Sequence, residues 1–383
     1  RGRMTAALEA AAASFPRDGR LAQAFALRMT LPRAGAGGRE IERALATAEA
    51  ALAAGDYAQA RAGFGEVTRK DPLNADAWAS LAQAQSQLGD HREALASVAR
   101  ARAIEPVDEE LRVLALDVEL RANPKLALSS PDLRTRRALA EDYVMRAVAA
   151  LSAGNEVAAK RLCDTAAALD EANADAYYIR ALSFSEPDRA IPDLQRAVER
   201  YRRRYQKSGS DSDGLNLARA IGLSASLRVA KAVKASDGIE LQRLLAEVAE
   251  ARRLEPLDPG LLANEVNIRI VMEIQNRTQG RPTNTDLMLD QANRLVRRHP
   301  DFAAAHQMQA LAYRVAGRSG DAIGALTAAL KRDPTFASAY AQRAELYVEL
   351  GLCARARADA AEARRWKLRG QDHLERELAK CPT

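Results

Sequence analysis

Residues 74 to 106 read NADAWASLAQAQSQLGDHREALASVARARAIEP and predict two consecutive helices. In the first helix, Trp78, Leu81 and Leu88 keep the three-and-four spacing of one helical face. Gly89 then predicts the end of this helix, because glycine adopts a left-handed backbone at little cost. Pro106 closes the unit, since proline does not continue a helix. The second helix carries small or β-branched residues on one face, at Ala94, Val98 and Ala101.

The unit repeats along the chain with a period of 34 residues. This shift relates four pairs of helix-ending residues: Gly55 and Gly89, Pro72 and Pro106, Pro300 and Pro334, and Gly317 and Gly351. A fixed period of this length is typical of helical repeats, in which each pair of helices buries its apolar face against the next pair. The sequence therefore predicts an elongated array of helix pairs.

These residues resemble the tetratricopeptide repeat family, whose unit carries W-x2-L-G-x2-Y, then A-x3-F, then P. Trp78, Leu81, Ala94 and Pro106 fit this pattern directly. The resemblance covers most of the chain, with roughly half of the units close to the pattern. It implies an all-α fold, an α-solenoid in which antiparallel helix pairs form a right-handed superhelix. It also implies a function in binding rather than in catalysis.

The placement of the units predicts the domain organisation. Residues 1–40 would hold a partial N-terminal repeat and a loop, which suggests a chain cut from a longer protein. Residues 41–207 would form a first array, 208–214 a flexible linker, and 215–350 a second array with degenerate, insertion-bearing repeats. Residues 351–383 would supply the last repeat helix and a C-terminal capping helix.

The composition agrees with packed helices. Hydrophobic residues make up 48% of the chain but aromatic residues only 4%, so that most apolar side chains are small or aliphatic. A sheet sandwich would draw on more aromatic and β-branched residues. The net charge of +6 is small beside the 57 basic and 51 acidic side chains, and it favours solubility over a nucleic-acid partner.

The cysteines and histidines predict no chemistry of their own. The three cysteines, Cys163, Cys353 and Cys381, are far apart and form no CxxC pair, so we expect no disulfide framework. Unpaired cysteines favour a reducing, cytoplasmic location. We also expect a bacterial protein. The four histidines lack the spacing of a metal site, so neither a metal nor a cofactor is expected. No apolar run approaches the length of a membrane span. No order of residues indicates a catalytic site.

The first helices of the units predict a partner-binding groove on their shared inner arc. This arc is polar near Asp76, Gln83 and Gln87 and becomes apolar further along the chain. The anchors would be Met308 and Leu311, with Arg314 and Gln342 as polar guides. The full set of candidates is Met145, Val148, Ile179, Leu182, Met308, Leu311, Arg314, Val315, Gln342 and Glu345. Burial between neighbouring repeats is an equal alternative for these residues.

A second candidate surface is the basic stretch YRRRYQK at 201 to 207. Arg202, Arg203, Arg204 and Lys207 could contact a nucleic-acid backbone while the flanking tyrosines stack on bases. The preferred interpretation is a solvated helix extension, because one arginine cluster does not make a continuous basic groove.

The sequence thus favours a non-catalytic scaffold that binds a protein or peptide partner in its concave groove. The first alternative is a regulatory or sensor region of a larger signalling enzyme, such as a bacterial Ser/Thr kinase with its catalytic domain upstream. The second alternative is a nucleic-acid binder that uses the arginine clusters at 202–204, 297–298 and 364–365. We do not expect a nucleic-acid partner.

Overall fold

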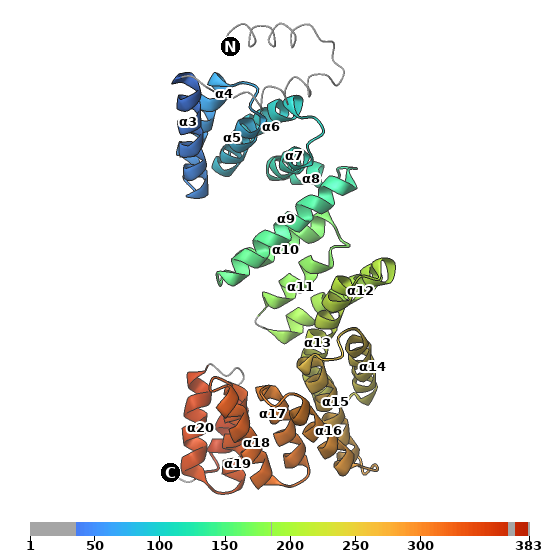
Figure 1. Ribbon diagram of the computed structural model, residues 1–383. Helices are drawn as coiled ribbons and strands as arrows, with labels where there is room; N and C mark the ends of the chain where they lie inside the picture. The colour runs from blue at the N-terminus through green and yellow to red at the C-terminus, as the bar shows by residue number, and fades with distance from the viewer. Residues whose placement is uncertain (1–35, 185, 367–371, 382–383) are drawn as a thin grey trace. The chain divides into compact units, whose positions relative to one another are not determined.

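The computed structural model describes residues 36–184, 186–366 and 372–381, and the regular elements within these ranges are α-helices (Figure 1). Most of the partial repeat expected at 1–40 lies outside the described residues. The helices are α3 (Ala36–Ala53), α4 (Tyr57–Lys70), α5 (Ala75–Leu88), α6 (His91–Ile104), α7 (Glu109–Ala122), α8 (Pro124–Leu128), α9 (Leu133–Ser152), α10 (Glu156–Leu169), α11 (Ala174–Leu182), α12 (Pro187–Ser208), α13 (Asp211–Lys234), α14 (Gly238–Leu254), α15 (Pro259–Thr278), α16 (Thr285–Arg298), α17 (Ala303–Val315), α18 (Ser319–Arg332), α19 (Ala337–Glu349), α20 (Cys353–Arg365) and α21 (Asp372–Leu378).

The turn inside the most regular repeat has the expected chemistry. Asn74 begins α5, and its side chain accepts a hydrogen bond from the Ala77 amide at 2.9 Å. Gly89 ends α5 with φ of +87°, a left-handed conformation that favours glycine. The amide of Asp90 then donates to the carbonyl of Gln85, and α6 starts at the next residue. The helix break predicted at Gly89 is therefore confirmed.

Small residues let the two helices of a pair approach closely. In the α3–α4 pair, Ala48 and Ala60 are fully buried or nearly so, and Phe64 fills the space beside them. A Cβ atom added to Gly63 would lie 2.7 Å from the Cβ atom of Ala48, closer than two such atoms approach in proteins. The alanine-rich composition thus reflects the short distance between paired helices.

The buried residues form a series of small cores, each built from neighbouring helices. One cluster joins Ala48 of α3 and Phe64 of α4 to Leu81 of α5. Another joins Ala310 of α17 to Leu326 of α18, together with residues of α19. In such an array the stability is approximately the sum of each pair and its contacts with its neighbours.

The chain divides into two compact units, of which the first ends at Asn173 and the second begins at Ala174. The flexible linker expected at 208–214 differs from what the structure shows, because only Gly209 and Ser210 lie between α12 and α13. Gly209 ends α12 in the left-handed conformation, and the Ser210 hydroxyl caps α13 by accepting from the Asp213 amide. Serine, glycine and aspartate serve helix ends as well as linkers, which explains the misinterpretation.

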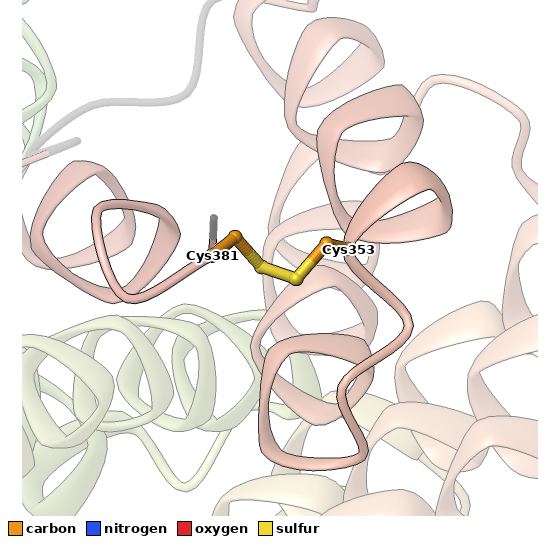
Figure 2. The surroundings of a disulfide bond; sticks show 2 residues. All are labelled: Cys353 and Cys381. Atoms are coloured by element: carbon orange, nitrogen blue, oxygen red, sulfur yellow. A yellow bond between two sulfur atoms is a disulfide. The ribbon is translucent and has the colours of Figure 1, made fainter. Parts of the chain in front are cut away.

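The last helix, α21, packs on α19 and α20 and covers the end of the second unit. Leu374 is buried there among alanines of both helices. Beside this contact Cys353, at the start of α20, forms a disulfide with Cys381, and their Cα atoms are 5.6 Å apart (Figure 2). The expectation of no disulfide was therefore wrong. The two cysteines are 28 positions apart in the sequence, so the sequence alone does not indicate this contact.

The disulfide removes the argument for a reducing compartment, because that argument depended on unpaired cysteines. The remaining cysteine, Cys163, is buried in α10. Within the described residues, no helix combines the length and the apolar character needed to cross a membrane.

Candidate protein-binding groove

A groove of about 1060 Å³ runs along α5, α7 and α9 in the first unit. These are the first helices of successive pairs, so the groove lies on the arc where the sequence placed a partner site. Asp76, Gln83 and Gln87 of α5 form one wall. Asp142 and Arg146 of α9 also line the groove, and α7 contacts both α5 and α9.

Acidic side chains dominate the lining of this groove. The carboxylates are Asp76, Asp108, Glu109, Glu110, Asp117 and Asp142, against two arginines, Arg121 and Arg146. Several of these acids also stabilise helix starts, where the helix dipole favours negative charge. Asp108 begins α7 by accepting from the amides of Glu110 at 2.7 Å and Leu111 at 3.1 Å.

Some of these carboxylates have partners within the protein and others do not. Asp117 is buried and accepts from the Tyr143 hydroxyl at 2.8 Å, and Asp142 forms an ion pair with Arg146. Asp76 and Glu110 are exposed and have no hydrogen-bonding side-chain or ion-pair partner among the described residues. These two carboxylates are therefore available to a ligand.

The carboxylates at one end of the groove affect the pKa of a neighbouring side chain, Glu105. Partial burial, and then the charges of Asp76 and Asp108, raise the pKa of Glu105 above its ordinary value. Burial and nearby negative charge both disfavour the ionised form of a carboxyl group, and both therefore raise its pKa.

The predicted groove residues of the α9 and α11 helices lie outside this lining. Met145 and Val148 of α9 are 68% and 37% exposed, on the turns that carry Asp142 and Arg146. Ile179 is half-buried and Leu182 is 41% exposed on α11, in the second unit. Asp142 and Arg146 could not be identified from the sequence, because the face that α9 turns to the groove depends on the packing of α9 against α7 and α10.

The predicted anchors of the late repeats contact the core of the second unit. Met308, Leu311 and Val315 are half-buried and pack against a cluster that contains Val266, Ile270 and Leu295. Gln342 is half-buried on α19.

Arg314 and Glu345, two further candidates, are brought together as partners of each other. The Arg314 guanidinium lies 2.8 Å from Glu345 and 2.6 Å from Glu349. Both side chains thus already have internal ion pairs.

The basic stretch at 201 to 207 is largely neutralised by acidic residues. Arg202 donates two hydrogen bonds to Glu250, at 2.9 and 2.8 Å. Arg204 contacts Asp175 at 3.0 Å and Asp213 at 2.6 Å. Arg203 pairs with Glu199 at 2.5 Å, and Lys207 is exposed.

Tyr201, at the start of this stretch, also has a hydrogen-bond partner within the protein. Tyr201 is only 2% exposed, and its hydroxyl donates to Asp175 at 2.6 Å. A buried ring cannot stack on a base. These contacts favour the helix extension over a nucleic-acid site.

The histidine in a helix-packing position has a structural role. His306 is 5% exposed, and its Nε2 atom donates to the carbonyl of Pro300 at 2.8 Å. Trp78 makes the equivalent bond, from its ring N–H to the carbonyl of Pro72, also six residues earlier. Among the described residues, no three His, Cys, Asp or Glu side chains are grouped to hold a metal.

Stacked helix pairs with a groove along their first helices define an α-helical repeat protein. The tetratricopeptide repeat family matches residues 51–116, and it matches again at 289–337 and 307–369. The chain therefore contains tetratricopeptide repeats in both of its units.

Several solved structures resemble this chain at low sequence identity. The TPR domain of P58(IPK) is 19% identical over 89% of this chain and 97% of that chain, with a TM-score of 0.28. A chain of the APC/C hetero-tetramer Cut9–Hcn1 gives 14% identity, 84% and 59% coverage and a TM-score of 0.41. Yeast Tom70 gives 12% identity, 85% and 69% coverage and a TM-score of 0.39. No curated protein matches the chain.

Proposed function

We propose that this chain is a non-catalytic scaffold whose groove along α5, α7 and α9 takes a positively charged segment of a protein partner. The observation that carries the proposal is the excess of carboxylates in a groove of about 1060 Å³. Opposite charges attract the partner during encounter and fix its orientation once it is bound.

The groove offers three kinds of contact to an extended or helical segment. Asp76 and Glu110 are exposed carboxylates for lysine or arginine side chains. Gln83 and Gln87 are exposed amides that can donate to and accept from a peptide backbone. Met145 lies outside the groove lining, but on the same helix as Asp142 it adds exposed apolar surface of the kind that marks interaction sites.

In the second unit, apolar side chains on α11 and α17 would contact the same partner or a different one. They are Ile179, Leu182, Met308, Leu311 and Val315, with Gln342 beside them. Arg314 and Glu345 would act indirectly, by holding α17 against α19 through their ion pair.

The test uses a short fluorescent peptide of alternating lysine and alanine, and a matched peptide of glutamate and alanine. Binding is measured by fluorescence anisotropy at about 0.15 M salt, where the Debye length is ~8 Å. The lysine peptide should bind and the glutamate peptide should not. Replacing Asp76→Lys together with Glu110→Lys should weaken the lysine peptide about tenfold or more, which is a change of ~1.4 kcal/mol.

The matched control replaces Glu93→Lys together with Glu156→Lys. These two exposed acids also lie in the first turns of helices, α6 and α10, but they do not line the groove. The charge change and the effect on the helix dipoles are therefore the same. Equal weakening in both variants would show unspecific attraction, and no binding of the lysine peptide would reject the basic segment.

A further inference from the structure

An arginine-lined pocket of about 500 Å³ lies in the second unit between α14, α15 and α16. The two outer helices both pack against α15, which forms the floor with Leu262 and Val266. Five arginines from three helices surround this floor: Arg252, Arg269, Arg294, Arg297 and Arg298. The pocket is distinct from the acidic groove, which belongs to the first unit and to the first helices of its pairs.

The internal ion pairs leave this pocket positive. Glu265 is the single carboxylate in the lining, and it contacts both Arg252 and Arg269. Asp290 lies outside the lining and pairs with Arg294 at 2.7 Å and with Arg297 at 3.6 Å. Even with Asp290 counted, the five guanidinium groups outnumber the two carboxylates by three charges.

Two of the arginines have hydrogen-bond donors without acceptors. Arg298 is exposed and has no hydrogen-bonding or ion-pair partner among the described residues. The Nε atom of Arg252 is buried and likewise lacks an acceptor in the part of the chain that the structure describes. Buried donors in proteins nearly always have acceptors, so the charge of Arg252 is incompletely compensated beside the pocket, and the exposed Arg298 guanidinium is available to a ligand.

We propose that this pocket binds a small phosphorylated ligand that carries two or three adjacent phosphate groups. Guanidinium groups form paired hydrogen bonds with phosphate oxygens, and the bonds are strengthened by charge. A diphosphate carries about three negative charges near neutral pH, which matches the excess in the pocket. The volume lies within the range of ~300–1,000 Å³ that is typical of small-molecule sites.

A nucleic-acid strand is a poorer fit for the same arginines. Strand binding needs a basic track that follows the backbone over several nucleotides. The other two arginine clusters supply no such track, because Arg202 and Arg204 pair with acids and Arg364 contacts Glu375 at 2.6 Å.

The experiment is calorimetric titration of the whole chain with inorganic tripolyphosphate. Parallel titrations use ADP, inorganic phosphate, citrate and an oligothymidylate. We expect tripolyphosphate and ADP to bind with similar affinity, and inorganic phosphate to bind at least about tenfold more weakly because it makes fewer paired contacts. Citrate also carries three anionic groups that can pair with arginine, so weaker binding of citrate tests selectivity for phosphate over carboxylate. A clear preference for ADP would still support the phosphate site and would identify a nucleotide as its source.

The decisive variant is Arg297→Ala with Arg298→Ala, which should weaken tripolyphosphate binding about tenfold or more. The matched control is Arg243→Ala with Arg253→Ala, which removes the same charge from exposed positions of α14 that do not line the pocket. This control should stay within about twofold of the unmodified protein. Circular dichroism and thermal unfolding confirm that both variants fold.

Three results would overturn the proposal. The first is no tripolyphosphate binding at about 0.15 M salt. The second is citrate binding as tightly as tripolyphosphate, which would reject phosphate selectivity. The third is an equal loss in both variants, or tighter oligothymidylate binding that weakens equally in both, since either would indicate a diffuse basic surface.

Discussion

The hydroxyl of Tyr143 donates to the buried carboxylate of Asp117 at 2.8 Å, and this bond ties α9 to α7. A tyrosine–aspartate hydrogen bond recurs between Tyr201 and Asp175, again 26 positions apart in the sequence and with a distance of 2.6 Å. A buried tyrosine thus connects neighbouring helices at two places in this chain. A buried carboxylate that lost this donor would keep an incompletely compensated charge.

Tyr143 also predicts how stability depends on pH. Burial, and then the charge of Asp117, raise the pKa of the Tyr143 hydroxyl well above its usual value of about 10. Above about pH 10 the unfolded chain loses this proton and the folded chain keeps it, so the free energy of unfolding falls as the pH rises. The contribution is fully present below about pH 10 and is lost toward the higher pKa of the folded state.

Tyr143→Phe should remove this alkaline loss and cost about 1–2 kcal/mol at neutral pH, where Asp117 loses a donor. Denaturant unfolding between about pH 8 and pH 11 measures both effects. The control is Tyr57→Phe, a half-buried tyrosine in the first turn of α4. An unchanged alkaline slope in Tyr143→Phe would show that other groups cause the loss.

Two glycines of α4 should respond in opposite directions to the same substitution. Gly63→Ala should destabilise the protein by about 1–3 kcal/mol, because the new methyl group would overlap Ala48 and push α3 away. Gly65→Ala should stabilise by about 0.5–1 kcal/mol, because no atom lies within 4 Å of the added carbon and alanine favours the helix. Thermal unfolding of the two variants compares them directly, and the same sign in both would contradict this packing.

The basic stretch should prove structural rather than nucleic-acid binding. Arg202→Ala removes a bidentate contact with Glu250 and should lower the free energy of unfolding by about 1 kcal/mol. Arg203→Ala removes an exposed pair four residues apart and should change it by less than about 0.5 kcal/mol. Neither change should alter the anisotropy of a labelled single-stranded oligonucleotide. A loss of oligonucleotide binding in both variants would restore the nucleic-acid interpretation.

The sequence predicted the helix pairs and their period because these depend on local chemistry. Gly89 and Asn74 act at helix ends through their own backbone and side-chain preferences. The inner-arc position of Asp76, Gln83 and Gln87 followed from helical spacing alone, and all three line the groove. The same spacing pointed to Met145 on α9, which does not line it, because the rotation of a helix is set by its neighbours.

Contacts between residues far apart in sequence could not be predicted in this way. Arg202 finds Glu250 across 48 residues, and this pairing changes an apparent basic patch into an ion-pair network. The arginine-lined pocket is another example. Arg297 and Arg298 come close to Arg252 and Arg269 only when α14 and α16 pack on α15. The disulfide is a third example, because neither cysteine lies in a recognisable motif.

The Cys353–Cys381 disulfide should hold α21 on the end of the second unit. In the chain-entropy estimate, a closed loop of 28 residues contributes about 3–4 kcal/mol, and here the effect should fall on the final helices. Cys353→Ser with Cys381→Ser, or a reductant, should therefore raise amide hydrogen exchange across Asp372–Leu378 and leave that of α3 to α6 unchanged. The reductant should have no further effect on the double variant, which separates this bond from reactions at Cys163. Equal exchange in α21 with and without the disulfide would show that Leu374 alone, through its buried contacts with α19 and α20, is sufficient to hold the helix in place.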